Sequence, residues 1–253
     1  MIPWFEWKTI MLGPLTLQVW GLFVAMGMLV GVWIITKRGK RFGVNTDQLF
    51  NMIFFLIVLG LIFSRLFHVF LYEPDFYLEH PGEILKIWYG GLSSFGGLFG
   101  AGVGFLFLIK KFQWKEKFFL VSDILSFGAV FGWMIGRIGC FMIHDHLGQH
   151  SNCPLAIQTP DGSRLDMALL EILGMIPLAI VFFVFRKKHV AQGWFTGILF
   201  VYYGVLRFIL DFFRATDIAA ADTRYFGLTP GHYSAIILVF VGGFILYKTS
   251  WKK

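Results

Sequence analysis

Long apolar runs alternate with short polar connections along this chain. Seven runs stand out, at residues 17–36, 50–72, 91–109, 119–143, 167–185, 193–213 and 232–247. Most approach the roughly 20 residues that an α-helix needs to cross about 30 Å of hydrocarbon. The pattern predicts an all-α integral membrane protein with seven transmembrane helices, forming a single polytopic membrane domain over residues 1–253.

The composition agrees with this class. Hydrophobic residues make up 57% of the 253 positions and charged residues only 15%, against about 25% charged residues in soluble domains. The mean hydropathy is +0.70. The rival interpretation, a soluble helical protein with an unusually large core, is therefore disfavoured.

Basic residues mark one side of the predicted membrane protein. Of the 22 Lys and Arg residues, 14 follow the first, third, fifth and seventh runs: Lys37, Arg38, Lys40, Arg41, Lys110, Lys111, Lys115, Lys117, Arg186, Lys187, Lys188, Lys248, Lys252 and Lys253. By the positive-inside rule, the N-terminus lies outside and the C-terminus in the cytoplasm. The net charge of +7 is thus mainly a topology signal that suits anionic membrane lipids. No nucleic-acid partner is expected, because the charge is divided among four short loops.

Polar residues gather on the predicted outer side. The longest polar connection covers residues 144–166, and the connection 214–231 is long enough to fold over a cavity. The first contains residue types that bind metals, namely His144, Asp145, His146, His150 and Cys153, but they lack an established ligand spacing. We expect no metal there. Whether Cys140 and Cys153 form a disulfide stays open.

Two polar constellations stand in or beside apolar runs. Arg137 belongs to GRIGCFMIHDHLG (136–148), and Tyr203, Arg207 and Asp211 in YGVLRFILDFFR share one helix face at spacings of four. Arginines in membrane spans are costly and usually functional. Because the guanidinium fork suits phosphate oxygens, the pattern predicts a phosphate clamp. The alternative is a structural ion pair between Arg207 and Asp211.

Two further features admit two interpretations each. His68, near Arg65 in SRLFHVFLYE, is either a packing residue or a site residue. The segment 89–104, YGGLSSFGGLFGAGVG, contains seven glycines. It either lets helices pack closely or forms a distorted helix start that approaches a lipid head group.

Several of these motifs resemble one family. GRIGCFMIHDHLG is similar to the signature G-R-x-(G/A)-N-F-(L/I/V/M/F)-N-x-E-x-x-G of the bacterial prolipoprotein diacylglyceryl transferases. Segments 13–27, 64–73, 89–100 and 203–214 resemble other parts of that family. The likeness covers nearly the whole chain, and the family has seven spans with an outside N-terminus.

The resemblance implies a reaction. The family transfers the diacylglyceryl group of phosphatidylglycerol to the lipobox cysteine thiol of a prolipoprotein and releases glycerol 1-phosphate, without a cofactor. It implies a bacterial cytoplasmic (inner) membrane location, with the active site on the periplasmic side. Arg137 and Arg207 align with the family's essential arginines, and Tyr203 and Asp211 with their supporting residues. Asp145 replaces the signature Glu. We expect substrate-binding roles for Trp20, Ser93, Ser94, Gly96, Gly97, Gly148 and Arg214.

The departures from the family pattern leave alternatives open. Phe95 replaces the histidine proposed as the thiol base, Trp20 replaces a Tyr, and Cys140 replaces an Asn. A relocated base among His68, His144 and His146 could serve the same reaction. Alternatively, a thiol with a pKa of about 8.5 could ionise beside the arginines without a base. The chain could also transfer lipid to another acceptor, or be a non-catalytic lipid-binding membrane protein.

Overall fold

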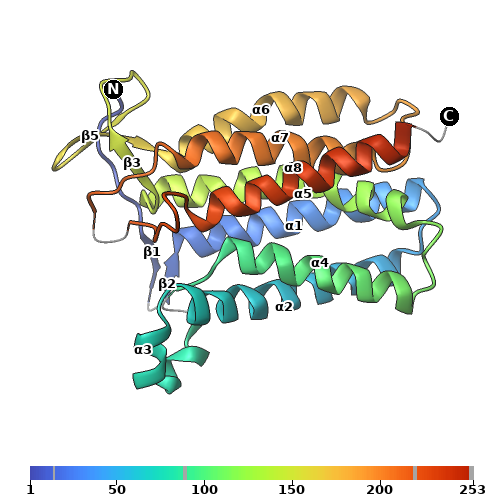
Figure 1. The fold of residues 1–253 in the computed structure, drawn as a ribbon, viewed down its shortest axis with the longest axis horizontal. Coiled ribbons are helices and arrows are strands. Elements are labelled where there is room, and N and C mark those ends of the chain that lie inside the picture. The colour runs from blue at the N-terminus through green and yellow to red at the C-terminus, as the bar shows by residue number, and fades with distance from the viewer. Residues whose placement is uncertain (14, 88–89, 219–220, 251–253) are drawn as a thin grey trace. The chain divides into compact units, whose positions relative to one another are not determined.

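The computed structural model describes residues 1–13, 15–87, 90–218 and 221–250 (Figure 1). Seven of its helices have 18 to 26 residues: α1 Val19–Arg41, α2 Thr46–Leu71, α4 Ser94–Lys111, α5 Phe118–Ile143, α6 Met167–Phe185, α7 Trp194–Asp211 and α8 Pro230–Ser250. Each coincides with one predicted run. Among the described residues, six of these helices are long and apolar enough to cross a membrane. α4, which ends in two lysines, is not one of the six, so the predicted count of seven transmembrane helices is approximate. The mostly helical membrane fold is confirmed.

Short elements that the apolar pattern did not predict join these helices. A hairpin of β1 (Thr9–Leu12) and β2 (Leu15–Gln18) precedes α1. Between α5 and α6, the strands β3 (Leu147–His150), β4 (Ile157–Thr159) and β5 (Gly162–Asp166) form an antiparallel sheet in the order β3-β5-β4. Helix α3 (Pro74–Glu79) and the 3₁₀-helix η1 (Pro81–Leu85) follow α2. The predicted outer loop 144–166 is therefore largely a small sheet.

The described residues form two compact units. One contains Met1–Arg38 and Phe119–Lys253, and the other is Gly39–Phe118. A single domain over the whole chain stays a prediction.

In the second unit, α2 packs closely against α4 through glycines. A Cβ atom added at Gly96 would lie 2.4 Å from the carbonyl oxygen of Phe63, so only a residue without a side chain permits this approach. Gly90 and Gly91, by contrast, have φ of +90° and +71° in the preceding loop. The glycine-rich segment therefore serves helix packing in one half and an irregular backbone in the other.

In the first unit, an aromatic core brings α5, α6 and α7 together. Phe127 and Val130 of α5, Met175, Leu178 and Phe182 of α6, and Phe195 of α7 form this buried cluster. Helix α1 approaches α5 at Gly27 and Gly132, where a Cβ atom on Gly27 would lie 2.4 Å from the Gly132 carbonyl oxygen. These contacts hold the helices at fixed separations. The geometry of the polar site, which side chains of α5, α6 and α7 form, depends on those separations.

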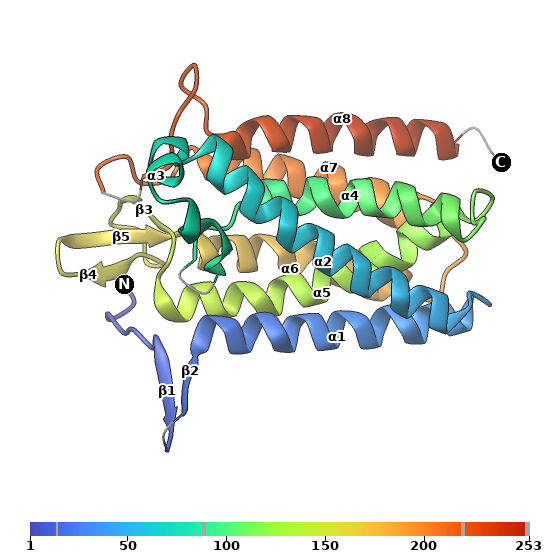
Figure 2. The ribbon, with the colours of Figure 1, turned by 90° about the horizontal axis from the view of Figure 1, so that it is seen from below.

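A buried carboxylate anchors the start of α7 on α5. Asp123 of α5 accepts hydrogen bonds from the backbone N–H groups of Gly193 (2.7 Å) and Thr196 (2.9 Å), and from the Thr196 hydroxyl (2.9 Å). It thus satisfies N–H groups that the first turn of a helix leaves unpaired. The opposite end of this unit carries the β3-β5-β4 sheet and the β1–β2 hairpin (Figure 2).

Candidate active site

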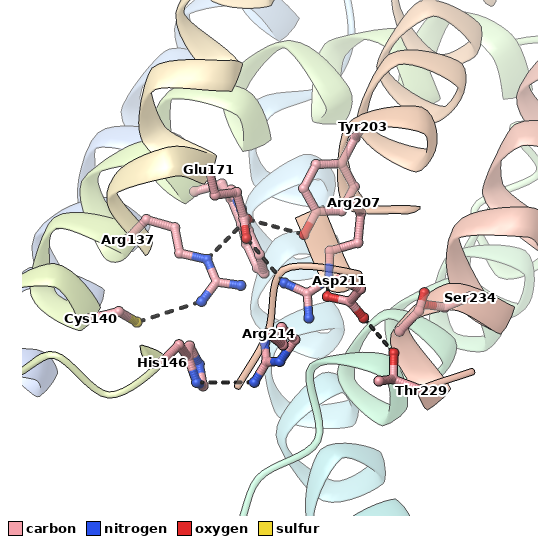
Figure 3. A network of polar contacts seen from close by, with 12 residues as sticks. Arg137, Cys140, His146, Glu171, Tyr203, Arg207, Asp211, Arg214, Thr229 and Ser234 are labelled. Atoms are coloured by element: carbon pink, nitrogen blue, oxygen red, sulfur yellow. Dashed lines mark hydrogen bonds and ion pairs between the residues drawn. The ribbon is translucent and has the colours of Figure 1, made fainter. Parts of the chain in front are cut away.

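Glu171 of α6 is the centre of a buried polar network (Figure 3). Its Oε1 atom accepts hydrogen bonds from Trp133 Nε1 (2.6 Å), Arg137 Nε (3.0 Å) and the Tyr203 hydroxyl (3.2 Å). Its Oε2 atom lies 3.2 Å from Nη1 of Arg207. One carboxylate thus joins side chains of α5, α6 and α7 and places two arginines on either side of itself.

A second carboxylate holds Arg207. Asp211 lies one turn further along α7, and its Oδ1 atom is 3.0 Å from the Nε of Arg207. The predicted pairing of these residues is confirmed. It is an ion pair rather than a well-aligned hydrogen bond, since Asp211 Oδ1 has no hydrogen-bond partner among the described residues. With Nη1 on Glu171, the guanidinium of Arg207 is held on two sides, which restricts its plane.

Arg137 is held by groups from two helices. Its Nε donates to Glu171, its Nη1 lies 3.8 Å from the Cys140 sulfur, and its guanidinium lies over the ring of Trp133 at 4.9 Å. Cys140 stands one turn away on α5, where the family signature has an Asn. The ring of Trp133 supports the cation and also donates to Glu171.

Arg214 brings a third guanidinium group from the segment after α7. It pairs with Asp222, and its Nη2 lies 3.5 Å from Nδ1 of His146. Burial lowers the pKa of Arg214 from its ordinary value, and repulsion from Arg207 and Arg137 lowers it further. The three guanidinium groups are therefore close enough to interact.

Each of these guanidinium groups keeps one terminal nitrogen unpaired. Nη2 of Arg137, Nη2 of Arg207 and Nη1 of Arg214 have no hydrogen-bond partner among the described residues. In Figure 3 the three heads gather beneath Glu171. Three carboxylates, Glu171, Asp211 and Asp222, formally balance their charge. The site would therefore bind an anion through oriented N–H donors rather than through a large net positive charge.

The β3-β5-β4 sheet positions Arg214. Gly148 of β3 bridges to Arg214, and a Cβ atom at Gly148 would lie 2.7 Å from the carbonyl oxygen of Phe213. Arg164 of β5, itself buried, makes a bidentate contact with Asp217 at 2.9 and 2.8 Å. Gly148 thus permits the close approach of the segment after α7, and Arg164 holds that segment through Asp217.

The histidines of the signature segment have different surroundings. His144 is buried, with Nδ1 2.9 Å from Asp166 Oδ2, and it packs on Trp4, Phe5 and Phe141. His146 is partly exposed and lies 3.5 Å from Asp145 through Nε2. Burial and the three nearby arginines hold the pKa of His146 well below 6.5. His146 is therefore neutral at neutral pH, whereas His144 has a structural partner.

One group of side chains has ligand types that could hold a metal ion. The donor atoms of Cys140, Asp145 and His146 all lie within 4.8 Å of one another. Arg137 contacts the Cys140 sulfur and Arg214 contacts His146, so a cation there would face two guanidinium groups at close range. This arrangement suits an anion better. Cys140 and Cys153 are both free thiols.

Several predicted site residues have local structural roles. Trp20 of α1 lies against Gly139 of α5. The Ser93 side chain caps α4 by accepting from the N–H of Gly96 at 3.2 Å, and Gly97 follows in the same turn. Ser94 begins α4, but its side chain is outside the described residues. Substrate binding by these residues stays a prediction.

His68 and Phe95 belong to the unit Gly39–Phe118. His68 Nε2 lies 3.7 Å from a Glu73 carboxylate oxygen, and Phe95 packs against Phe67 with ring centroids 5.9 Å apart. Arg65 donates to the backbone carbonyl groups of residues 83, 84, 90 and 91. Arg65 therefore holds the loop before α4, and a catalytic role for His68 stays a prediction.

The sequence reasoning missed Glu171. The signal was present, because Glu171 is the lone charged residue in the apolar run 167–185, and an ionisable residue inside a membrane span is a functional candidate by default. It also missed Trp133, whose indole N–H is indistinguishable in sequence from that of any packing tryptophan.

Comparisons with known proteins agree with the resemblance seen in the sequence. The family model described as "Prolipoprotein diacylglyceryl transferase" matches residues 8–248. A relative from Glaesserella parasuis is 32% identical, and the match covers 95% of this chain and 91% of the length of the relative. A relative from Nitrosomonas europaea is 30% identical over 97% of this chain and 90% of its own length. A relative from Mannheimia succiniciproducens is 29% identical over 96% of this chain and 92% of its own length. All three are named phosphatidylglycerol–prolipoprotein diacylglyceryl transferase.

We expect Glu171→Gln to destabilise the protein, because buried Arg137 and partly buried Arg207 lose their shared counter-charge. Removing one partner of a buried ion pair costs about 3 kcal/mol. Thermal unfolding in detergent micelles measures the loss, with Glu116→Gln at an exposed position as the matched control. Equal melting temperatures for the two variants would show that Glu171 does not hold the network together.

Proposed function

Because the chain belongs to the prolipoprotein diacylglyceryl transferase family, we propose that it transfers the diacylglyceryl group of phosphatidylglycerol to a prolipoprotein. The acceptor is the thiol of the lipobox cysteine. The C–O bond between the diacylglyceryl carbon and the phosphate oxygen breaks, a C–S bond forms at that carbon, the thiol proton is lost, and glycerol 1-phosphate leaves with the oxygen. The residues named below need no cofactor for this displacement.

The observation that carries the proposal is the convergence of three arginines. The guanidinium groups of Arg137, Arg207 and Arg214 gather beneath Glu171 (Figure 3), and each keeps one terminal nitrogen without a hydrogen-bond partner among the described residues. A phosphodiester accepts such donors through its oxygens. Negative charge grows on the leaving phosphate in the transition state, so preorganised donors stabilise that state most. Glu171 and Asp211 supply the preorganisation by fixing the two arginines.

The thiol proton has two routes out of the site. Neutral His146 is one candidate acceptor, but its Nδ1 already faces the donor Nη2 of Arg214 at 3.5 Å, so it can take the thiol proton only when that contact opens. The same guanidinium groups favour a thiolate and disfavour an imidazolium ion, so they also promote ionisation without a protein base. Asp145, 3.5 Å from His146, offsets part of the repulsion that an imidazolium ion would meet.

A second candidate function is transfer to a different acceptor. Phe95 stands where the family has a histidine, and a phenyl ring cannot accept a proton. Loss of the histidine with both arginines retained is the pattern expected if the lipid donor stayed the same while the acceptor changed.

The topology follows from charge. In the unit that contains the site, the basic residues at the ends of α1, α6 and α8 lie at the end opposite the β3-β5-β4 sheet and the arginines. We place these basic ends in the cytoplasm by the positive-inside rule. The protein then lies in a bacterial inner membrane with its active site on the periplasmic side.

The first test concerns the arginine clamp. Arg137→Lys and Arg207→Lys each keep the charge but lose the fork of donors, so we expect about a 10²-fold loss of rate, equivalent to about 3 kcal/mol. The assay combines purified protein, phosphatidylglycerol vesicles and a lipobox peptide, and follows glycerol phosphate release and the peptide mass. Arg41→Lys, at an exposed position, is the control. Wild-type rates in both site variants would contradict the clamp.

The second test concerns the topology. In a variant without the two native cysteines, Asn152→Cys in the outer connection should react with an impermeant maleimide on intact cells. Lys187→Cys, after α6, should react only after permeabilisation; both positions are exposed. The reverse labelling pattern would invert the orientation.

The third test concerns the base. We expect at least one of His146→Ala, His144→Ala and His68→Ala to lower peptide transfer by about 10²-fold, and His146 is the best-placed candidate. His144→Ala should mainly lower thermal stability, because it leaves Asp166 buried without its partner.

Phe95→His is the complementary variant, expected to preserve or raise transfer to the peptide. Full activity in all three histidine variants would mean that none of these three histidines acts as the base. If neither wild type nor Phe95→His modifies the peptide while glycerol phosphate is released, the acceptor is not a lipobox thiol.

A further inference from the structure

A buried polar chain lies behind the arginine site, on the far side of Asp211. The Thr229 hydroxyl donates to Asp211 Oδ2 at 2.6 Å, and Thr229 Oγ1 lies 2.9 Å from Nδ1 of His232. Asp211, Thr229 and His232 are 1%, 1% and 0% exposed. Three polar side chains buried together carry a large desolvation cost unless their geometry is well satisfied.

The backbone determines which way these hydrogen bonds run. The N–H of Thr229 donates to Nδ1 of His232 at 3.1 Å, so Nδ1 is an acceptor. The N–H of His232 in turn donates to Thr229 Oγ1 at 3.3 Å. The single hydroxyl proton of Thr229 therefore points to the carboxylate of Asp211, where the bond is short and charge-assisted.

The ring of His232 fixes this arrangement. It lies edge-on to Phe208 (5.1 Å) and Phe212 (4.4 Å). Because Nδ1 accepts, the neutral ring carries its proton on Nε2, which is buried and has no hydrogen-bond partner among the described residues. Burying the Nε2–H donor without a partner costs free energy. We infer that the ring is held in this position because its Nδ1 accepts from Thr229.

The first turn of α8 closes directly over the carboxylate. A Cβ atom at Gly231 would lie 2.0 Å from Asp211 Oδ2, so no other residue fits there without displacing Asp211. Asp211 is thus held by Thr229 on one oxygen and faces Arg207 with the other.

We propose that Thr229 and His232 are positioning residues for Arg207. They hold the carboxylate of Asp211 so that its free oxygen anchors Nε of Arg207 and leaves Nη2 directed at the phosphate of the lipid donor. This inference rests on the proposed function. Asp211 stands where the family pattern has the longer Glu, and the Thr229 hydroxyl contacts the oxygen of Asp211 that does not face Arg207.

The test compares variants that differ by one group. Thr229→Val removes the hydroxyl at nearly constant volume, Thr229→Ser keeps it, and Ser234→Ala is the control, because Ser234 donates to the Gly231 carbonyl in the same turn. We expect Thr229→Val to lower kcat for phosphatidylglycerol about tenfold, the order of one charge-assisted hydrogen bond, with little change in KM. Thr229→Ser should recover activity to within about threefold of wild type.

Two further measurements separate positioning from folding. In the Asp211→Asn background, Thr229→Val should add no further loss, because both act through one contact. His232→Asn, which keeps an acceptor near Thr229, should retain more activity than His232→Leu. A purely structural role would instead lower the melting temperature of each variant and leave kcat per folded molecule unchanged, which would overturn the proposal, as would additive losses.

Anion binding provides a readout that does not require turnover. Glycerol 1-phosphate affinity, measured calorimetrically, should fall in Arg207→Lys and in Thr229→Val and return in Thr229→Ser. If the wild type binds glycerol 1-phosphate but transfers no lipid, the proposed function fails while this order of affinities still supports the positioning role. If Thr229→Val binds as wild type does, or the wild type neither binds nor turns over, the positioning role is overturned.

Discussion

A single buried carboxylate governs the polar half of this protein. Glu171 accepts from Arg137, Arg207, Tyr203 and Trp133 at once, and without it buried Arg137 and partly buried Arg207 would lose their shared counter-charge. Burying an ion pair is rarely stabilising in itself, but removing one partner is strongly destabilising. The network therefore enforces a specific arrangement of three helices, whose result is a pair of guanidinium groups with fixed orientation.

That arrangement is possible only because packing contacts hold the helices at defined separations and at defined positions along one another. The aromatic cluster around Phe127 and Phe182 joins α5, α6 and α7, and Asp123 anchors the start of α7 on α5. The glycine contact between α1 and α5 sets the closest approach. A hydrogen bond tolerates a change of only a few tenths of an ångström in its donor–acceptor distance. The packing contacts far from the site therefore determine whether Arg207 reaches Glu171.

The small sheet and the start of α8 complete the site from outside the helices. The sheet holds Arg214 through the segment after α7, and Thr229 and His232 hold Asp211. The resulting charge pattern favours an anion with directed oxygen acceptors and disfavours a metal cation at Cys140, Asp145 and His146. This selectivity agrees with a reaction in which the leaving group is a phosphate ester.

The sequence by itself determined the membrane class, the seven long helices and the pairing of Arg207 with Asp211. The bilayer demands long apolar runs, and a spacing of four places two side chains on one helix face. Both are local constraints that a sequence displays directly. The motifs around Arg137 and Arg207 also indicated the family.

Only the tertiary structure decided the rest of the site. Glu171, Trp133 and Thr229 acquire their roles from partners 18 to 38 residues away, and no local pattern distinguishes them. His144 and His146 are two residues apart in one segment, yet one is buried against Asp166 and the other faces three arginines. Burial and partner identity depend on which helices pack together, and that packing is a property of the whole fold.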